Sequence, residues 1–396
     1  MASIANANPT ITIPRIDASS LSGSFHIENM YVLQNLPVIL FNAGVEQWRA
    51  WKDWRSHGDD KSHHINFEHL DSNFGQVTAP VTNCKSGHCI VLSVTNFLSA
   101  WKEAATSSKS PPLRYMKDWH LVRDFPDYQG YEIPKPYVTD WLNDWWTDPL
   151  GRALWAEEQQ REHSNNDYRF CYMGCKGTWT GLHHDVMCSF SWSANVIGRK
   201  LWRLFPPTET HKLYHHRIKD QLVLDSRDGM YDAHDFPNVS SAKFIDVVQE
   251  EGEIMFVPSG WHHQVHNLDD CISVNHNWLN GCCIERVWDY VQGRWHATKS
   301  VIEHLENEMD EIEFAQCCSK IMGADIGLTP EEFIAMLKFW KERLEKRMEH
   351  YTKEVDEEEE KEEEEKEDVA ELHDGSLERL NGVIEACTLE WPMLYR

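Results

Sequence analysis

Long apolar runs are missing from this sequence. None of its 396 residues belongs to a stretch that approaches the roughly 18 consecutive apolar residues of a membrane span. The first residues, MASIANANPTITIPRID, lack a basic start followed by an apolar stretch, which argues against a secretory signal. We therefore expect neither a transmembrane segment nor a membrane partner.

Basic residues are also scarce relative to acids. The chain has 38 Lys and Arg against 64 Asp and Glu, for a net charge of −26. Twelve acids and three lysines between Lys353 and Asp368 contribute −9, so the remainder carries −17. An acidic surface repels phosphate backbones. Direct nucleic-acid binding is therefore not expected, and a basic protein or peptide is the more plausible partner.

Cysteines do not form a recognisable framework. There are eleven, an odd number, and they include the adjacent pairs Cys282–Cys283 and Cys317–Cys318. This layout does not suit a set of disulfides. Two other closely spaced pairs lack the second pair that a structural zinc site needs. The layout favours reduced thiols in the cytosol, with the nucleus as the other location.

The fold class predicted by the sequence is mainly β, a jelly-roll or sandwich barrel with flanking helices. Short β-rich runs alternate with Gly, Pro and Asn turns across the barrel core, about residues 168–282, and a helical period follows in FIAMLKFWKERLEKRM. The expected divisions are a lead-in over 1–30, a catalytic domain over 31–300, helices over 301–352, an acidic low-complexity segment over 353–368 and a final helix over 369–396.

Strand alternation identifies a candidate metal site in WTGLHHD. Residues two apart on a strand share a face, so His183 and Asp185 point together while His184 points away. In VPSGWHHQVHN, the apolar face holds Trp261 and Val265, which favours His263 as a third ligand. Two histidines and one carboxylate can form the facial triad of non-haem Fe(II) enzymes. With 22 histidines in the chain, three core histidines are the competing interpretation, and the paired motifs weigh against it.

A buried lysine would complete such a site. After the turn at Gly198, Lys200 shares a face with Trp202 and Leu204, among apolar neighbours. A buried charge needs a partner, and an inward lysine beside iron is suited to the distal carboxylate of 2-oxoglutarate. A snorkelling surface lysine is the alternative.

The strand CISVNHNW has one polar face and one largely apolar face. Asn275 and Asn277 lie on the polar face, which would line either solvent or a wet cavity. Ser189, Ser191 and Ser193 repeat this polar alternation on an earlier strand.

These motifs, GTWTGLHHD, GRKLWRLFPP and GEIMFVPSGWHHQVHNLDD, together resemble the Jumonji-C (JmjC) family of Fe(II)- and 2-oxoglutarate-dependent dioxygenases. The resemblance implies a double-stranded β-helix, or cupin-like jelly roll, with Fe(II) held by His183, Asp185 and His263, and with 2-oxoglutarate and O2 as cosubstrates. It also implies a set of 2-oxoglutarate contacts: Tyr115, Thr180, Lys200, Asn275 and Asn277. Some members carry an asparagine where this chain has Ser189 and Ser193, which we include as candidate contacts.

YMKDWHL, SFSWSANVIGRK and VPSGWHHQVHNLDDCISVNHNWLNG are similar to a subgroup described as hydroxylating a lysine side-chain carbon in the eukaryotic class-one translation termination factor. That resemblance implies a lysyl hydroxylase that supports translation termination. An N-methyl-lysine demethylase would use the same iron chemistry, and a transfer-RNA hydroxylase is disfavoured by the charge. A catalytically inactive JmjC binding scaffold is the alternative from another class.

Overall fold

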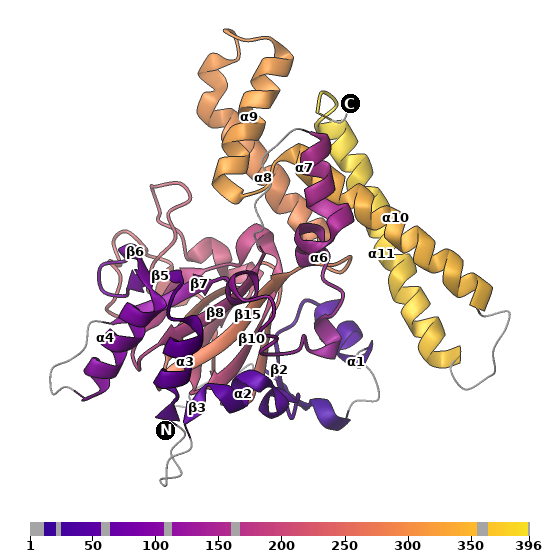
Figure 1. Ribbon diagram of the computed structural model, residues 1–396. Helices are drawn as coiled ribbons and strands as arrows, with labels where there is room; N and C mark the ends of the chain where they lie inside the picture. Colours follow the sequence, from indigo (N-terminus) through magenta and orange to yellow (C-terminus); the bar gives the residue numbers. More distant parts are fainter. Residues whose placement is uncertain are drawn as a thin grey trace, which may run out of the picture.

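The computed structural model describes residues 12–20, 25–56, 64–106, 113–159, 167–354 and 363–394. The acidic segment expected over 353–368 lies largely outside them, as do parts of the expected lead-in. Figure 1 shows a β-sheet body with short helices around one end and a group of longer helices on the opposite side. Within the described ranges, no helix is long and apolar enough to cross a membrane.

The larger of the two main sheets has nine strands in the order β1-β2-β13-β10-β15-β8-β7-β5-β6, antiparallel except for β1 with β2. Its strands are β1 (Arg15–Asp17), β2 (Val38–Phe41), β5 (Thr78–Asn83), β6 (Cys89–Ser93), β7 (Arg114–Trp119), β8 (Arg169–Gly174), β10 (Phe190–Ile197), β13 (Ile254–Val257) and β15 (Cys271–Trp278).

The smaller sheet packs against the inner face of the larger one. It has the antiparallel order β12-β11-β14-β9, formed by β9 (Trp179–His183), β11 (Lys200–Phe205), β12 (Ile245–Gln249) and β14 (His262–Asn267). Apolar side chains of both sheets, including Trp202, Met255 and Val257, form a buried cluster between them. A separate hairpin pairs β3 (Arg55–Ser56) with β4 (His64–Ile65). The two facing sheets are the jelly-roll architecture that the sequence predicts.

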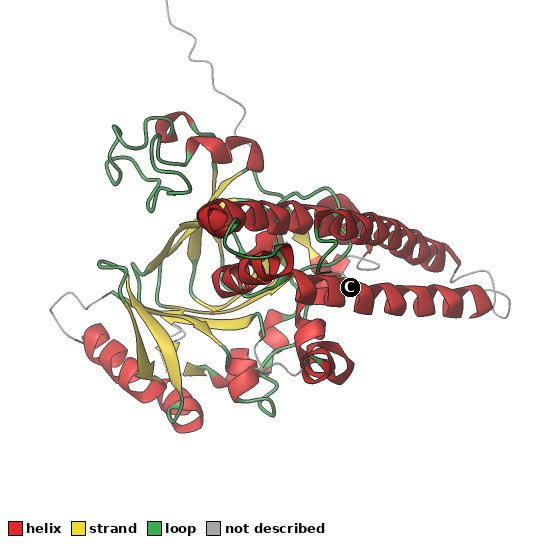
Figure 2. Cartoon of the chain, turned by 90° about the horizontal axis from the view of Figure 1, so that it is seen from above, coloured by secondary structure: helices red, strands yellow, loops and turns green. Residues whose placement is uncertain are grey.

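Helices cover the outer face of the larger sheet and extend beyond it (Figure 2). Those preceding the core strands are α1 (Phe25–Ile27), α2 (Arg49–Asp53), α3 (Phe67–Phe74), α4 (Val94–Thr106), α5 (Leu121–Asp124), α6 (Trp141–Thr147) and α7 (Leu154–Glu158). Those that follow are α8 (Ile284–Ile302), α9 (Glu311–Ile326), α10 (Pro330–Glu354) and α11 (Glu363–Glu390).

Tryptophans join the C-terminal helices to the body. Trp340 of α10 stacks on Trp141 of α6 with ring centroids 5.3 Å apart, and its Nε1 donates to the Trp141 carbonyl at 2.9 Å. Helix α11 packs on α10 and α8. The final helix, expected over 369–396, is offset along the chain. Helix α11 begins six residues earlier, inside the acidic run, and ends at Glu390, and its apolar positions Leu380, Val383 and Cys387 are buried against the other helices.

Candidate active site

Three side chains from two neighbouring strands meet at one end of the smaller sheet. His183 ends β9, Asp185 follows two residues later, and His263 lies on β14 as the Cα partner of His183. One ligand atom from each of the three lies within 4.8 Å of the others, the only such cluster in the described part of the chain. The structure therefore brings together the three residues that the motifs select.

The path of the chain between these ligands differs from the expectation. Asp185 lies beyond the end of β9, where the sequence argument places both residues on one strand. The backbone of Asp185 nevertheless stays extended, with φ −66° and ψ 156° before a 3-10 turn, so the two-residue alternation persists. His184 faces the other way and packs against His262 and Tyr290, with ring centroids 5.1 and 5.5 Å apart.

Backbone carbonyls orient both imidazoles. Nδ1 of His183 lies 2.8 Å from the Gly181 carbonyl oxygen, and Nδ1 of His263 lies 3.1 Å from that of Trp261. Each Nδ1 therefore donates, which leaves Nε2 as the electron-pair donor to a metal. Burial, with the neighbouring His263, lowers the pKa of His183 to about 3, so its ring is neutral near pH 7.

Both carboxylate oxygens of Asp185 are held by hydrogen bonds. Ser191 Oγ donates to Oδ2 at 2.8 Å, and Asn277 Nδ2 donates to Oδ1 at 2.7 Å. Asp185 is 9% exposed, so these donors replace most of the water that would solvate it. Asn277, expected to contact 2-oxoglutarate, thus also orients a candidate metal ligand. Ser191 belongs to the alternating serines, but its position in the sequence does not reveal this role.

Two imidazoles and one carboxylate are the donor set of the facial triad that binds non-haem Fe(II). His263 Nε2 lies 4.0 Å from Asp185 Oδ2, and the two imidazole ring centroids are 4.3 Å apart. The three donors come from one side of the site, which leaves the opposite side to the cavity. The residues present therefore fit a ferrous ion with open positions for cosubstrates.

A cavity of about 490 Å³ adjoins this cluster. Lys200 lines it and is 3% exposed, and its Nζ donates to Ser273 Oγ at 2.5 Å. No carboxylate of the described residues lies within ion-pair distance of this ammonium group. Burial lowers the pKa of Lys200 to about 8. A buried cation without an acidic partner is a receptor for an anionic ligand.

The other expected cosubstrate residues lie around the same cavity, with one exception. The lining includes Tyr115, Thr180, Ser193, Asn275 and Asn277. Ser193 Oγ is buried and has no hydrogen-bond partner, so it is available to a ligand. Ser189 is fully buried behind Asn277, whose Nδ2 lies 3.5 Å from its Oγ, and it is not part of the cavity wall.

A bulge in β7 adds two lining residues that the sequence analysis did not select. The pairing of β7 with β8 shifts between Met116 and Trp119, so Lys117 and Asp118 both line the cavity. Asp118 has a φ of 58°, which is unusual for a residue other than glycine. The Tyr172 hydroxyl donates to its Oδ1 at 2.8 Å.

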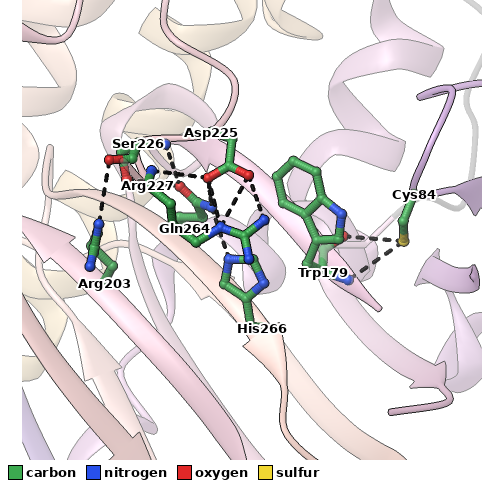
Figure 3. A network of polar contacts seen from close by, with 8 residues as sticks. All are labelled: Cys84, Trp179, Arg203, Asp225, Ser226, Arg227, Gln264 and His266. Atoms are coloured by element: carbon green, nitrogen blue, oxygen red, sulfur yellow. Dashed lines mark hydrogen bonds and ion pairs between the residues drawn. The ribbon is translucent and has the colours of Figure 1, made fainter. Parts of the chain in front are cut away.

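The segment between β11 and β12 supplies another part of the wall. Leu224, 67% exposed, lines the cavity, and its carbonyl accepts from the Leu182 backbone N–H at 2.8 Å. A polar network holds the adjacent residues (Figure 3). In it, Gln264 Nε2 donates to Asp225 Oδ1 at 2.7 Å, while Arg227 pairs with the same carboxylate. The position of Leu224 is therefore fixed by contacts distant in sequence.

Comparison with known proteins assigns the same chemistry. Residues 24–282 match the model of the cupin-like domain family. The chain is 36% identical over 317 residues to "2-oxoglutarate and iron-dependent oxygenase JMJD4" of Gallus gallus, covering 78% of this chain and 69% of the relative. The Homo sapiens protein of that name is 35% identical, with 79% and 72% covered. "Arginine-specific demethylase JMJ20" of Arabidopsis thaliana is 35% identical over 331 residues, with 82% and 69% covered.

Proposed function

The chain belongs to the JmjC, cupin-like family of 2-oxoglutarate- and iron-dependent oxygenases, and within that activity we propose that it hydroxylates a lysine side-chain carbon of the eukaryotic class-one translation termination factor. The motifs shared with the subgroup described for that reaction support the proposal. The reaction would take place in the cytosol or nucleus, where the termination factor and reduced thiols are found.

Fe(II) with 2-oxoglutarate and O2 supplies the oxidant when bound. His183, Asp185 and His263 would hold the metal, and Ser191 and Asn277 keep the carboxylate ligand in one orientation. Lys200 would pair with the distal carboxylate of 2-oxoglutarate. Leu182, Trp202 and Val265 form the apolar part of the cavity wall.

The observation that carries the choice of substrate class is an acid at the cavity wall. Asp118 is exposed and forms no ion pair within the described residues, and Tyr172 fixes its carboxylate by a hydrogen bond. Such a group can accept a hydrogen bond from a protonated amine entering the cavity. The overall charge of −26 would also speed the encounter with a basic protein surface. Both features favour a cationic side chain as the substrate.

A demethylase is the second candidate, favoured by the name of the Arabidopsis relative. Arginine and methyl-lysine are also cations, so Asp118 would suit them equally. The two reactions differ in the product: hydroxylation leaves the oxygen atom on the substrate, whereas demethylation removes a methyl group as formaldehyde. An inactive scaffold is disfavoured because a complete ligand set and a buried, unpaired lysine remain.

Mass spectrometry of the termination factor after incubation with the enzyme, Fe(II), ascorbate and 2-oxoglutarate separates these functions. The proposal predicts one added oxygen atom on a single lysine. A methyl loss from a pre-methylated peptide without any oxygen gain would instead support the demethylase. The His183→Ala variant is the matched inactive control, and an unmodified factor with active enzyme would refute the proposed substrate.

A further inference from the structure

A second cavity lies on the other side of the larger sheet from the active site. It has a volume of about 190 Å³, and its walls are α5, the segment 125–133 and the strands β8 and β15. His276 and Arg169 are Cα partners in these two strands, as are the adjacent residues Asn275 and Phe170. Asn275 and Phe170 line the catalytic cavity, whereas His276 and Arg169 line the second one. The same two strands therefore serve two separate cavities.

Two nitrogen atoms of this cavity are buried without partners. His276 is 1% exposed; its Nε2 lies 2.6 Å from the Tyr131 hydroxyl, but its Nδ1 has no hydrogen-bond partner. Arg169 Nε is likewise buried and unpaired, and no carboxylate of the described residues lies within 4.0 Å of the guanidinium. Unpaired buried polar atoms are rare and costly. Nε is such an atom in Arg169, although the residue as a whole is half-buried.

The nearest acids are occupied elsewhere. Asp140 accepts from the Leu142 and Asn143 backbone at the start of α6, and Asp167 lies 2.6 Å from His120 Nδ1. These two carboxylates and that of Asp144 act on the region through longer-range electrostatics, but within the described residues none of the three forms an ion pair with Arg169. The guanidinium is therefore open to an anion that enters the cavity.

The remaining walls are apolar. Leu121, Val122, Phe125 and Ile133 face the same space. Gln129, also in the wall, has a φ of 45°, a strained conformation for a side chain with a Cβ. A hydrated inorganic ion would leave this apolar surface uncovered, whereas a hydrocarbon group would bury it.

We propose that this cavity is a binding site for a small organic carboxylate with an aromatic or branched apolar body. The carboxylate pairs with Arg169 and accepts from His276 Nδ1, and the apolar body packs on the segment 121–133. Such a ligand is distinct from 2-oxoglutarate, whose second carboxylate would have no cation here.

Fluorine NMR with 4-fluorobenzoate tests the site on full-length protein whose catalytic site is filled with Mn(II) and 2-oxoglutarate without oxygen. We expect saturable binding of one molecule. Arg169→Gln should weaken it by about tenfold or more, through the loss of a charge-assisted hydrogen bond. Val122→Phe, which fills the apolar part of the cavity, should also weaken binding of the probe. This variant keeps Arg169, so it tests the site even if Arg169→Gln does not fold. The matched control, Ile218→Ala, changes an exposed residue that lines neither cavity, and it should leave binding of the probe unchanged.

Three outcomes overturn the proposal. One is the absence of saturable binding to the wild-type protein. Another is binding that strengthens when 2-oxoglutarate is left out and that Val122→Phe retains, which would assign the probe to the catalytic cavity. A third is displacement of the probe by inorganic phosphate at a lower concentration than benzoate requires. That result would show that the cavity prefers an inorganic anion to an organic carboxylate.

Discussion

The two faces of β10 and β15 carry side chains of different character. On the outer face, Trp192, Val274 and Trp278 are fully buried in the main apolar core. On the inner face, Ser191 and Asn277 hold Asp185 beside the candidate metal centre. The same two strands thus give stability through one face and chemistry through the other.

Both faces of β10 and β15 are buried, so the serines and asparagines of the inner face need partners other than bulk water. All residues of β10 and β15 are buried, so water does not solvate the serines and asparagines. Each buried polar group needs a partner. Ser191 and Asn277 have Asp185 as theirs, while Ser193 Oγ is left for a ligand in the cavity. Within this polar face, Ser193 Oγ is thus a group that the folded chain alone does not satisfy.

Removal of a candidate metal ligand at the active site should have the largest effect on activity. His183→Ala should reduce iron-dependent succinate formation by more than about 100-fold, since even the outer partners of metal ligands typically contribute 10–100-fold. His184→Ala is the matched control, because its ring packs on His262 and Tyr290 instead of facing the cluster. Equal activity losses in the two variants would contradict the assignment of His183.

Lys200→Met should raise the KM for 2-oxoglutarate by about 10- to 100-fold, the effect of losing one charged hydrogen bond. The wild-type protein should also bind 2-oxoglutarate more weakly as the pH rises above about 8, where buried Lys200 loses its proton. In the free protein the pKa of Lys200 lies below its ordinary value of 10.5. Between pH 8 and 10.5 the unfolded chain therefore binds more protons at this residue than the folded protein does, and the free energy of unfolding rises with pH. In Lys200→Met, both pH dependences should disappear. Calorimetry measures the affinity for 2-oxoglutarate, and denaturant titration measures the free energy of unfolding.

Ser191→Ala should weaken metal affinity by about tenfold, because Asp185 loses one of its two side-chain donors. Ser189→Ala offers a control just before the same strand, since the hydrogen bond of its hydroxyl is to Asn277 Nδ2, at 3.5 Å. Metal titration followed by tryptophan fluorescence would compare them. Indistinguishable affinities would show that Ser191 does not orient the ligand.

On the outer face, Ile272→Val should act on stability alone. Ile272 is fully buried in the apolar core, and removing one methylene group should cost about 1 kcal/mol of unfolding free energy. The KM for 2-oxoglutarate and the turnover of the folded enzyme should stay at wild-type values. A changed KM with unchanged stability would mean that the two faces are not separable.

Alternation along strands accounts for what the sequence could predict. It placed Lys200 with Trp202 inside the barrel and separated the polar from the apolar face of CISVNHNW, because side chains of a strand alternate strictly. It also separated His183 from His184, although Asp185 lies just beyond the strand. The motifs spanning 179–278 were informative because the spacing of their residues follows the two-residue period of a β-strand.

Irregular backbone and distant contacts account for what could not be predicted. The bulge in β7 breaks the alternation and turns both Lys117 and Asp118 into the cavity. Leu224 lines the cavity from a segment that is held by contacts distant in sequence, among them the hydrogen bond from Gln264 on β14 to Asp225. The start of α11 inside the acidic run was not predicted, and the packing of this helix on α8 and α10 joins segments distant in sequence.

Anomalous diffraction from crystals grown without oxygen in Mn(II) and 2-oxoglutarate tests the central claim most directly. The account predicts one manganese peak bounded by Nε2 of His183, Nε2 of His263 and the Asp185 carboxylate, with the distal carboxylate of 2-oxoglutarate at Lys200 Nζ. A peak away from these three ligands, or a cosubstrate that leaves Lys200 unpaired, would contradict it.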